Sequence, residues 1–557
     1  MMSNDLTSKK WKKWTATGMT LALATGLLAG CSGGDDPGKQ ENQVVRIGVL
    51  YGGPENEPYF RQQYTDMYEM MNPNVQFEIV TAVNYDDQRY MQQKPGEEVE
   101  RPNPYEEMKN LMTGNNPVDV VVIDYGMLRR FTQDNLLQPL DPLIQKDKFD
   151  LTDYVDTVIE GIKQAGDNQI FALTPTFTSS ALYYNKKIFA DNNIEPPQDK
   201  MQWADILNLA RQVSSGEGED RTFGFSFNRW SNDGFSSVMS YSESLQLKMW
   251  DDKGEKMLVN TDGWADAWDT VYKLYQEDIV PDEEFMQIMY NKMASSDGSY
   301  TYDPFGGDLF LKGKVAMTID GYYYINELRR ANDNADKIEN FEMVDWDVVT
   351  VPTHSSAPDI GGNIYLSQLM GINTKSPNPE GAWDFIKFSN SEDWARLKSR
   401  SLHELVARKE FLKPIAGMDY NVNAFTTLKP IPPSTVDEER IYQDNPGIWD
   451  VQNVGREMFQ KVMSGEMDTR QALAEWEVRG NEILQRIPGA DGGVIEPMPM
   501  PRVTEEEVTE EVTEEVPAED TAAEASSEAS SEDAAVDEPA TDDSAADDTV
   551  STSNTSE

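Results

Sequence analysis

Apolar runs alternate with amphipathic segments along the first part of the chain, and this order predicts strands and helices in turn. The run 44–50 ends at Gly52 and Gly53, an amphipathic segment covers 57–71, and a second apolar run covers 75–80 after an Asn-Pro-Asn turn. A strand, a helix and a second strand in this order form a βαβ unit. We therefore expect an α/β protein with parallel strands.

Aromatic and acidic residues follow several of the predicted strands. Ligands of open parallel sheets bind beyond the carboxyl ends of the strands, so residues at those ends are candidates for ligand binding. They are Tyr51 after the first strand, Asp124 and Tyr125 after the continuous apolar run 118–123, Trp230 after 223–228, and Tyr322 and Tyr323 after 315–319.

The stretch 171–189 (FALTPTFTSSALYYNKKIF) changes from a Thr- and Pro-rich part to an apolar, aromatic part. Pro175 fixes its own φ and favours extended geometry at Thr174, so two extended segments can meet there at a defined angle. We interpret the stretch as a crossover between two lobes. An ordinary loop followed by a strand within one domain fits these residues equally well. The end of the chain's folded part is predicted to be a helix over 469–487, with apolar residues at helical spacing.

The first thirty residues (1–30) have the pattern of an export signal. Lysines precede an apolar run at 17–29 that is short for a permanent membrane span, and the sequence LAGC follows at 28–31. Cys31 is the chain's one cysteine, so it can form no internal disulfide. LAGC resembles the lipobox of bacterial lipoproteins, which implies a diacylglyceryl group on Cys31; the alternative is a plain signal peptide with an incidental thiol. The polar segment 31–43 suits a flexible tether.

Acidic residues dominate the charge of the chain, with 98 Asp and Glu against 48 Lys and Arg and a formal net charge of −50. From Val503 onward there are twenty acidic residues and no basic one, which leaves −30 for the rest. The segment 491–557 lacks the apolar residues needed to offset its chain entropy, so we expect a disordered acidic tail. Nucleic-acid binding is disfavoured, because phosphates would be repelled.

The inventory of catalytic residues is poor. The two histidines, His354 and His403, have no motif partner, and the sequence contains neither a GxSxG nucleophile motif nor an HExxH zinc helix. The segment 297–303 faintly resembles a calcium loop but lacks the glycine at the sixth position and the closing glutamate. We therefore expect a protein without enzymatic activity, without a bound metal and without a cofactor. A glycosidase carboxylate pair stays open on sequence alone, because 98 acidic residues make some pair inevitable.

Seven stretches in order resemble the extracellular solute-binding proteins of ABC importers, in the family that includes the maltose-binding protein. They span 44–487 and are NPNVQFEIV, PVDVVVID with LLQPLD, ALYYNKKIF, FLKGKVAMTIDG, the GG…GI stretch 361–372, EGAWDFIKF and SGEMDTRQALAEWE. The resemblance departs at SLHELVARKEF, where Leu405 and Val406 stand in place of the family's proline. The chain is also longer than typical members, with insertions near 92–103 and 297–303 that could reshape a cleft or bind an ion.

The resemblance implies a type II periplasmic-binding-protein-like fold with two α/β lobes, each a mainly parallel sheet flanked by helices and joined by a hinge. It assigns 44–174 with about 366–425 to an N-terminal lobe and 175–365 with about 426–490 to a C-terminal lobe. It implies a monomer, lipid-anchored on the outer face of the cell membrane of a Gram-positive bacterium, that captures an oligosaccharide and delivers it to ABC permease subunits. The rival classes are a surface-anchored glycan hydrolase and a cell-wall adhesive lipoprotein.

Sugar sites combine flat apolar faces with planar polar groups. By resemblance, Tyr322 and Tyr323 match the segment where the family carries a ligand-stacking aromatic residue, and Trp449 matches a stacking tryptophan. By the same resemblance, 361–366 would be a second crossover. Asn363 in this segment and Thr178 in the first crossover are further candidates, although Gly-Asn and Thr-Ser turns also form without ligands. For each aromatic candidate the alternative is an ordinary packed ring, since the chain contains 55 Phe, Trp and Tyr residues.

Overall fold

The computed structural model describes residues 42–90, 102–229, 233–293, 303–338, 341–361, 364–400, 404–415, 417–432, 441 and 448–486. The predicted signal peptide with Cys31, the acidic tail, Trp230 and Asn363 lie outside these residues, as do His403, most of the tether and nearly all of both insertions. Among the described residues, no helix combines the length and the apolar character needed to cross a membrane.

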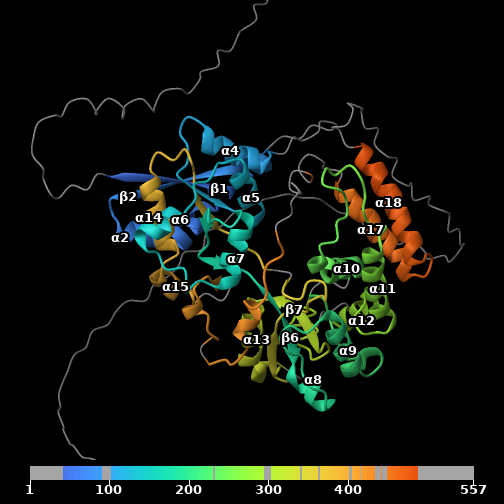
Figure 1. The fold of residues 1–557 in the computed structure, drawn as a ribbon. Helices are drawn as coiled ribbons and strands as arrows, with labels where there is room; N and C mark the ends of the chain where they lie inside the picture. The colour runs from blue at the N-terminus through green and yellow to red at the C-terminus, as the bar shows by residue number, and fades with distance from the viewer. Residues whose placement is uncertain are drawn as a thin grey trace, which may run out of the picture. The chain divides into compact units, whose positions relative to one another are not determined.

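The first lobe is built on a five-stranded sheet (Figure 1). Its strands, in the spatial order β2-β1-β3-β9-β4, are β2 (Val75–Asn84), β1 (Gln43–Gly52), β3 (Val120–Ile123), β9 (Leu369–Ile372) and β4 (Ala172–Leu173). β1 pairs in parallel with β2 and β3, which confirms the predicted βαβ unit. β9 runs antiparallel to both β3 and β4.

Helices cover both faces of this sheet. On one face, a Cβ at Gly48 would lie 3.0 Å from the Met108 sulfur of α4 (Pro104–Thr113), so a glycine allows the helix to approach closely. Phe77 has the opposite strand parity and faces the other side. There its ring lies 4.7 Å from that of Phe385 in α14 (Pro379–Ser389) and 5.6 Å from that of Tyr68 in α2 (Asp66–Met71).

The second lobe contains a three-stranded sheet in the order β7-β6-β8. Its strands are β7 (Met317–Gly321), β6 (Ser180–Asn185) and β8 (Trp346–Val349). The expectation of a mainly parallel sheet needs correction here, because β6 is antiparallel to both neighbours. β6 begins beside the end of β7, with Ser180 opposite Gly321, so the two strands run in opposite directions. The predicted strand 223–228 does run parallel to β7, through bridges from Phe223 to Val315 and from Ser226 to Thr318.

The chain passes from the first sheet to the second within residues 174–179, between β4 and β6. This confirms the interpretation of 171–189 as a crossover. The short strand β5 (Thr176–Phe177) lies inside the crossover and pairs with β10 (Leu405–Val406). A second passage runs alongside the first, because Thr178 and Tyr365 form an antiparallel bridge.

A helical layer of the second lobe forms around Trp476. The layer consists of α10 (Gly234–Ser242), α11 (Asp262–Gln276), α17 (Ile448–Met463) and α18 (Thr469–Arg486), which lie together in Figure 1. The Trp476 ring stacks on Trp268 at 5.6 Å, and its indole N–H donates to the Val451 carbonyl oxygen at 2.7 Å. The predicted C-terminal helix is therefore confirmed, with its apolar face buried.

The remaining elements are helices and short helical turns. They are α1 (Glu57–Phe60), a π-helical turn (Arg61–Thr65), α3 (Tyr85–Arg89), α5 (Tyr125–Gln133), α6 (Asp141–Asp147), α7 (Asp156–Ala165), α8 (Lys186–Asp191), α9 (Trp203–Val213), α12 (Glu283–Met293), α13 (Tyr324–Asp333), α15 (Glu392–Lys398) and short 3₁₀ turns at Gly218–Asp220, Glu243–Leu245, Ala335–Lys337, Lys409–Phe411 and Val422–Phe425.

Candidate ligand-binding site

Three strand ends of the first lobe meet at one edge of the five-stranded sheet. Tyr51 and Gly52 end β1, and Asp124 follows β3. β9 runs the opposite way, and its first residue, Leu369, pairs with Ile123 at the end of β3. The residues just before β9 therefore reach the same edge as the residues just after β1 and β3.

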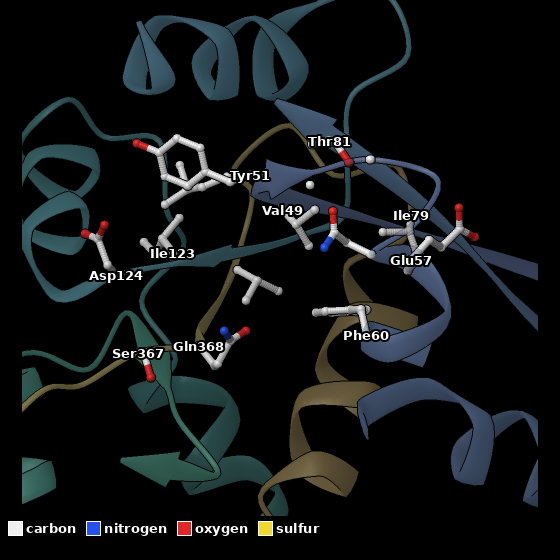
Figure 2. A pocket seen from close by; sticks show the side chains of 15 residues that line it. Val49, Tyr51, Glu57, Phe60, Ile79, Thr81, Ile123, Asp124, Ser367 and Gln368 are labelled. Carbon is white, nitrogen blue, oxygen red and sulfur yellow. The ribbon is translucent and has the colours of Figure 1, made fainter. Parts of the chain in front are cut away.

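A cavity of about 280 Å³ opens at this edge. Strand β1 contributes Tyr51 and Gly52, the turn after it Gly53 and Asn56, and α1 Glu57 and Phe60; Thr81 and Ile79 come from β2, Asp124 from the end of β3, and Ser367 and Gln368 from the segment before β9. In Figure 2 Tyr51 and Asp124 lie on one side, Glu57 and Phe60 lie on the other, and the Gln368 amide lies below them. The volume is slightly below the usual range for complete small-molecule sites, as expected if one lobe supplies part of a site.

Asp124 has a structural role in addition to its place at the cavity. It is the N-cap of α5, and its Oδ1 accepts a hydrogen bond from the Met127 N–H at 2.8 Å. Burial raises the pKa of Asp124, while the backbone N–H donors of Met127 and Gly126 act in the opposite direction. An N-cap requires only one carboxylate oxygen, so this partly buried carboxylate beside the cavity can also accept hydrogen bonds from a ligand.

Gln368 and Ser367 are cavity residues that the sequence reasoning missed. Gln368 has φ of 58°, in the left-handed region that side chains other than glycine and asparagine seldom occupy. Such strain gathers at functional sites. The rule of strand carboxyl ends did not find these residues, because they lie at the amino end of a reversed strand.

The short helix α1 supplies a second group that was missed. Asn56, Glu57 and Phe60 line the cavity, and Glu57 and Phe60 lie across it from Tyr51 (Figure 2). The Glu57 carboxylate is held in place by Arg61, whose Nε donates to Oε1 at 2.8 Å. Their only sequence signal is that they follow the Gly52-Gly53 turn directly.

Tyr125 and Thr178 are not among the residues that line this cavity. The Tyr125 hydroxyl donates to the Gly161 carbonyl oxygen of α7 at 3.0 Å. Thr178 lies in the first crossover, where its backbone pairs with Tyr365. Whether either residue contacts a ligand stays a prediction.

The second lobe presents Tyr323 rather than Tyr322 at its surface. Tyr322 is 6% exposed and packs edge-on against Phe425, with ring centroids 5.4 Å apart. Tyr323 is 45% exposed. Burial, followed by the negative charge of Asp320, raises the pKa of Tyr323.

A buried ionic cluster lies beneath Tyr323. Arg229 is the last described residue before Trp230. It donates through Nη1 to Asp308 Oδ2 at 3.2 Å and through Nε to Asp320. Its guanidinium lies 3.8 Å from the ring centroid of Tyr324, whose hydroxyl donates to Asp308 at 2.9 Å. The cluster fixes the end of β7, two residues before Tyr323. It also fixes Arg229, the residue that precedes Trp230.

Trp449 lies on α17 and is 57% exposed. It does not line the cavity of the first lobe.

Within the described residues, no group of His, Cys, Asp or Glu side chains is arranged to hold a metal ion. The imidazole of His354 lies 2.7 Å from the Tyr241 carbonyl oxygen, and burial lowers its pKa.

Two lobes joined by adjacent crossovers, with a cavity of mixed apolar and polar lining at the strand ends of one lobe, define a binding protein of the two-lobed type II periplasmic class. Residues 77–396, more than half of the chain, match the family model described as bacterial extracellular solute-binding protein. The chain belongs to this family.

Solved structures show the same fold at low sequence identity. The sugar-binding protein MalE from Xanthomonas citri is 17% identical, with 80% of this chain and 98% of that chain covered and a TM-score of 0.52. A sugar transporter from Rhizobium etli in an open conformation is 17% identical, with coverages of 80% and 99% and a TM-score of 0.52. An extracellular solute-binding protein of family 1 from Alicyclobacillus acidocaldarius is 13% identical, with coverages of 80% and 100% and a TM-score of 0.53.

Proposed function

We propose that this solute-binding protein captures an oligosaccharide between its lobes outside the cell and delivers it to the permease of an ABC transporter. The observation that carries the proposal is the composition of the cavity in the first lobe. It combines the flat face of Tyr51 with the planar amides of Asn56 and Gln368 and the carboxylates of Glu57 and Asp124. Sugars require this combination of apolar faces and paired hydrogen-bonding groups.

Two of the similar structures are described as a sugar transporter and a sugar-binding protein, which supports the same ligand class. In the proposal, residues 44–174 with 366–425 form one lobe and 175–365 with 426–490 form the other. Tyr323 and Trp449, together with Trp230 from the undescribed part of the chain, complete the sugar contacts from the second lobe. The protein acts as a monomer without a cofactor.

Calorimetric titration of the mature protein against a panel of oligosaccharides tests the proposal. We expect saturable binding of at least one series and no turnover of any glycan. Binding of peptides together with silence across the sugar panel would overturn the sugar assignment, and release of shorter glycans would favour a hydrolase.

We further propose that a lipid on Cys31 holds the protein at the outer face of the membrane. The support is the LAGC sequence and the lack of any second cysteine. Expression of Cys31→Ser in a Gram-positive host should move the protein from the membrane fraction to the medium. Retention of that variant in the membrane would contradict lipid anchoring without affecting the sugar proposal.

A further inference from the structure

Two tyrosine rings lie parallel at the end of the β1–β2 strand pair. Tyr51 is near the end of β1, and Tyr85 follows Asn84, which pairs with Gly52. The ring centroids of Tyr51 and Tyr85 are 6.3 Å apart, and the ring planes differ by 8°. Tyr51 lines the cavity described above, whereas Tyr85 lies beyond the cavity-lining residues.

The two rings do not stack face to face in direct contact. Parallel rings in van der Waals contact have planes about 3.5–4 Å apart, and the centroid distance of 6.3 Å is larger than that spacing. Tyr51 is 45% exposed and Tyr85 is 47% exposed. The pair therefore extends an aromatic surface outward from the cavity.

Contacts on both sides of Tyr85 position the backbone that carries its ring. The Asn84 Oδ1 accepts a hydrogen bond from the Asp86 N–H at 3.0 Å, which sets the start of α3. At the end of α3, Arg89 Nη1 lies 4.0 Å from Glu55 Oε1 in the turn that follows β1. A backbone that is already positioned need not be reordered when a ligand binds, which favours the use of Tyr85 as a stacking surface.

We propose that Tyr51 and Tyr85 form a second stacking subsite, so that the ligand is an oligosaccharide with one ring in the cavity and a further ring on the tyrosine pair. This inference rests on the proposed function. The supporting observations are the parallel rings, their exposure, and the place of Tyr51 in the lining of the cavity. Single exposed aromatic residues are common on protein surfaces, but two adjoining ones beside a cavity form a local aromatic patch, and exposed apolar patches are a feature of binding surfaces.

The test is calorimetric titration with gluco-, xylo- and manno-oligosaccharides, each as a series from mono- to tetrasaccharide. It uses the mature wild-type protein and the variants Tyr85→Ala, Tyr85→Phe and Tyr59→Ala. Tyr85→Phe keeps the ring and loses only the hydroxyl. Tyr59 is a matched control, because it is an exposed tyrosine of the same lobe that does not line the cavity.

For the series that binds, the affinity of the wild-type protein should rise from the shortest to the longer members. Tyr85→Ala should bind the longer members about tenfold more weakly than wild type and should bind the shortest member equally well. Tyr85→Phe and Tyr59→Ala should retain wild-type affinity. An unchanged affinity of Tyr85→Ala for every length, or an equal loss for the shortest and the longer members, would overturn the second subsite while leaving sugar binding intact. Silence of the wild-type protein in every series would instead overturn the proposed function, and this inference with it.

Discussion

Thr178 and Tyr365 each donate a backbone hydrogen bond to the other, at 3.1 Å from the Thr178 N–H and 2.9 Å from the Tyr365 N–H. These residues lie in the two segments that pass between the lobes. The Thr174 hydroxyl adds a further link, because its oxygen lies 2.7 Å from the Ser367 carbonyl oxygen and 2.6 Å from that of Thr176. The two crossovers are therefore joined to each other by hydrogen bonds.

Replacing Thr174 by valine should weaken this junction without changing its shape. Thr174 is fully buried, so the substitution leaves buried carbonyl oxygens with one donor fewer. We expect the free energy of unfolding to fall by about 1–3 kcal/mol. Urea denaturation followed by tryptophan fluorescence measures the difference.

Thr427→Val is the matched control, because the exposed Thr427 hydroxyl donates only to the nearby Asn423 carbonyl oxygen, at 2.7 Å. Its effect should stay within about 0.5 kcal/mol. Equal stability of Thr174→Val and the wild-type protein would show that the hydroxyl contributes nothing to the junction.

Two substitutions of Asp124 should separate its structural role from its role toward a ligand. Asparagine is as good an N-cap as aspartate, so Asp124→Asn should retain the thermal stability of the protein, whereas Asp124→Ala should lose about 1 kcal/mol. If the carboxylate accepts hydrogen bonds from the sugar, both variants should bind more weakly than wild type in calorimetry.

The pH dependence gives an independent measure. Burial raises the pKa of Asp124, so wild-type affinity should fall as the pH drops through that raised pKa and the carboxylate becomes protonated. Asp124→Asn should lack this step. Wild-type affinity in Asp124→Asn would remove the carboxylate from the ligand contacts and leave it as a helix cap.

The neighbouring tyrosines of the second lobe should respond in opposite ways to truncation. Tyr322→Ala removes a buried ring from its contact with Phe425, so we expect the free energy of unfolding to fall by about 3 kcal/mol or more. Tyr323→Ala removes a half-exposed ring and should cost little stability, but should weaken sugar binding by about 1–3 kcal/mol. Urea denaturation and calorimetry on both variants measure the two effects. A Tyr322→Ala variant that lost sugar affinity but kept wild-type stability would contradict this prediction.

The ion pair between α17 and α18 should stabilise the helical layer at neutral pH and fail in acid. Glu457 accepts hydrogen bonds from Arg479 Nη1 at 2.9 Å and Nη2 at 2.8 Å, and these bonds are the main reason that its pKa is lowered from 4.5 to about 2. The carboxylate is partly exposed, so solvent screening limits its contribution to about 1 kcal/mol.

Because the folded pKa is the lower one, this stabilisation is complete above pH 4.5 and is lost as the pH falls toward 2. Glu457→Gln should therefore unfold more easily than wild type at pH 7, and the two should converge near pH 2. Asp252→Asn, which breaks the exposed pair with Lys248, is the control and should change little at either pH. A Glu457→Gln deficit that persists undiminished at low pH would rule out the charge as its cause.

Apolar runs and glycine turns were sufficient to predict most strands of the first lobe, because each element carries its own periodicity. They left the crossover at Pro175 open against an ordinary loop, and the family resemblance was needed to favour it. The same rules located Tyr51 and Asp124 at the cavity. They missed Gln368, because the reversal of β9 brings the amino end of that strand to the edge where parallel strands end. They also could not separate Tyr322 from Tyr323, since the turn after β7 decides which ring is buried.

The bonding between the two crossovers limits how the lobes can move. Strands that share hydrogen bonds form a ribbon, which bends readily across its flat face but resists sliding of one strand past the other. We expect sugar entry and release to follow one arc of opening, set by the direction in which the ribbon of Thr178 and Tyr365 flexes.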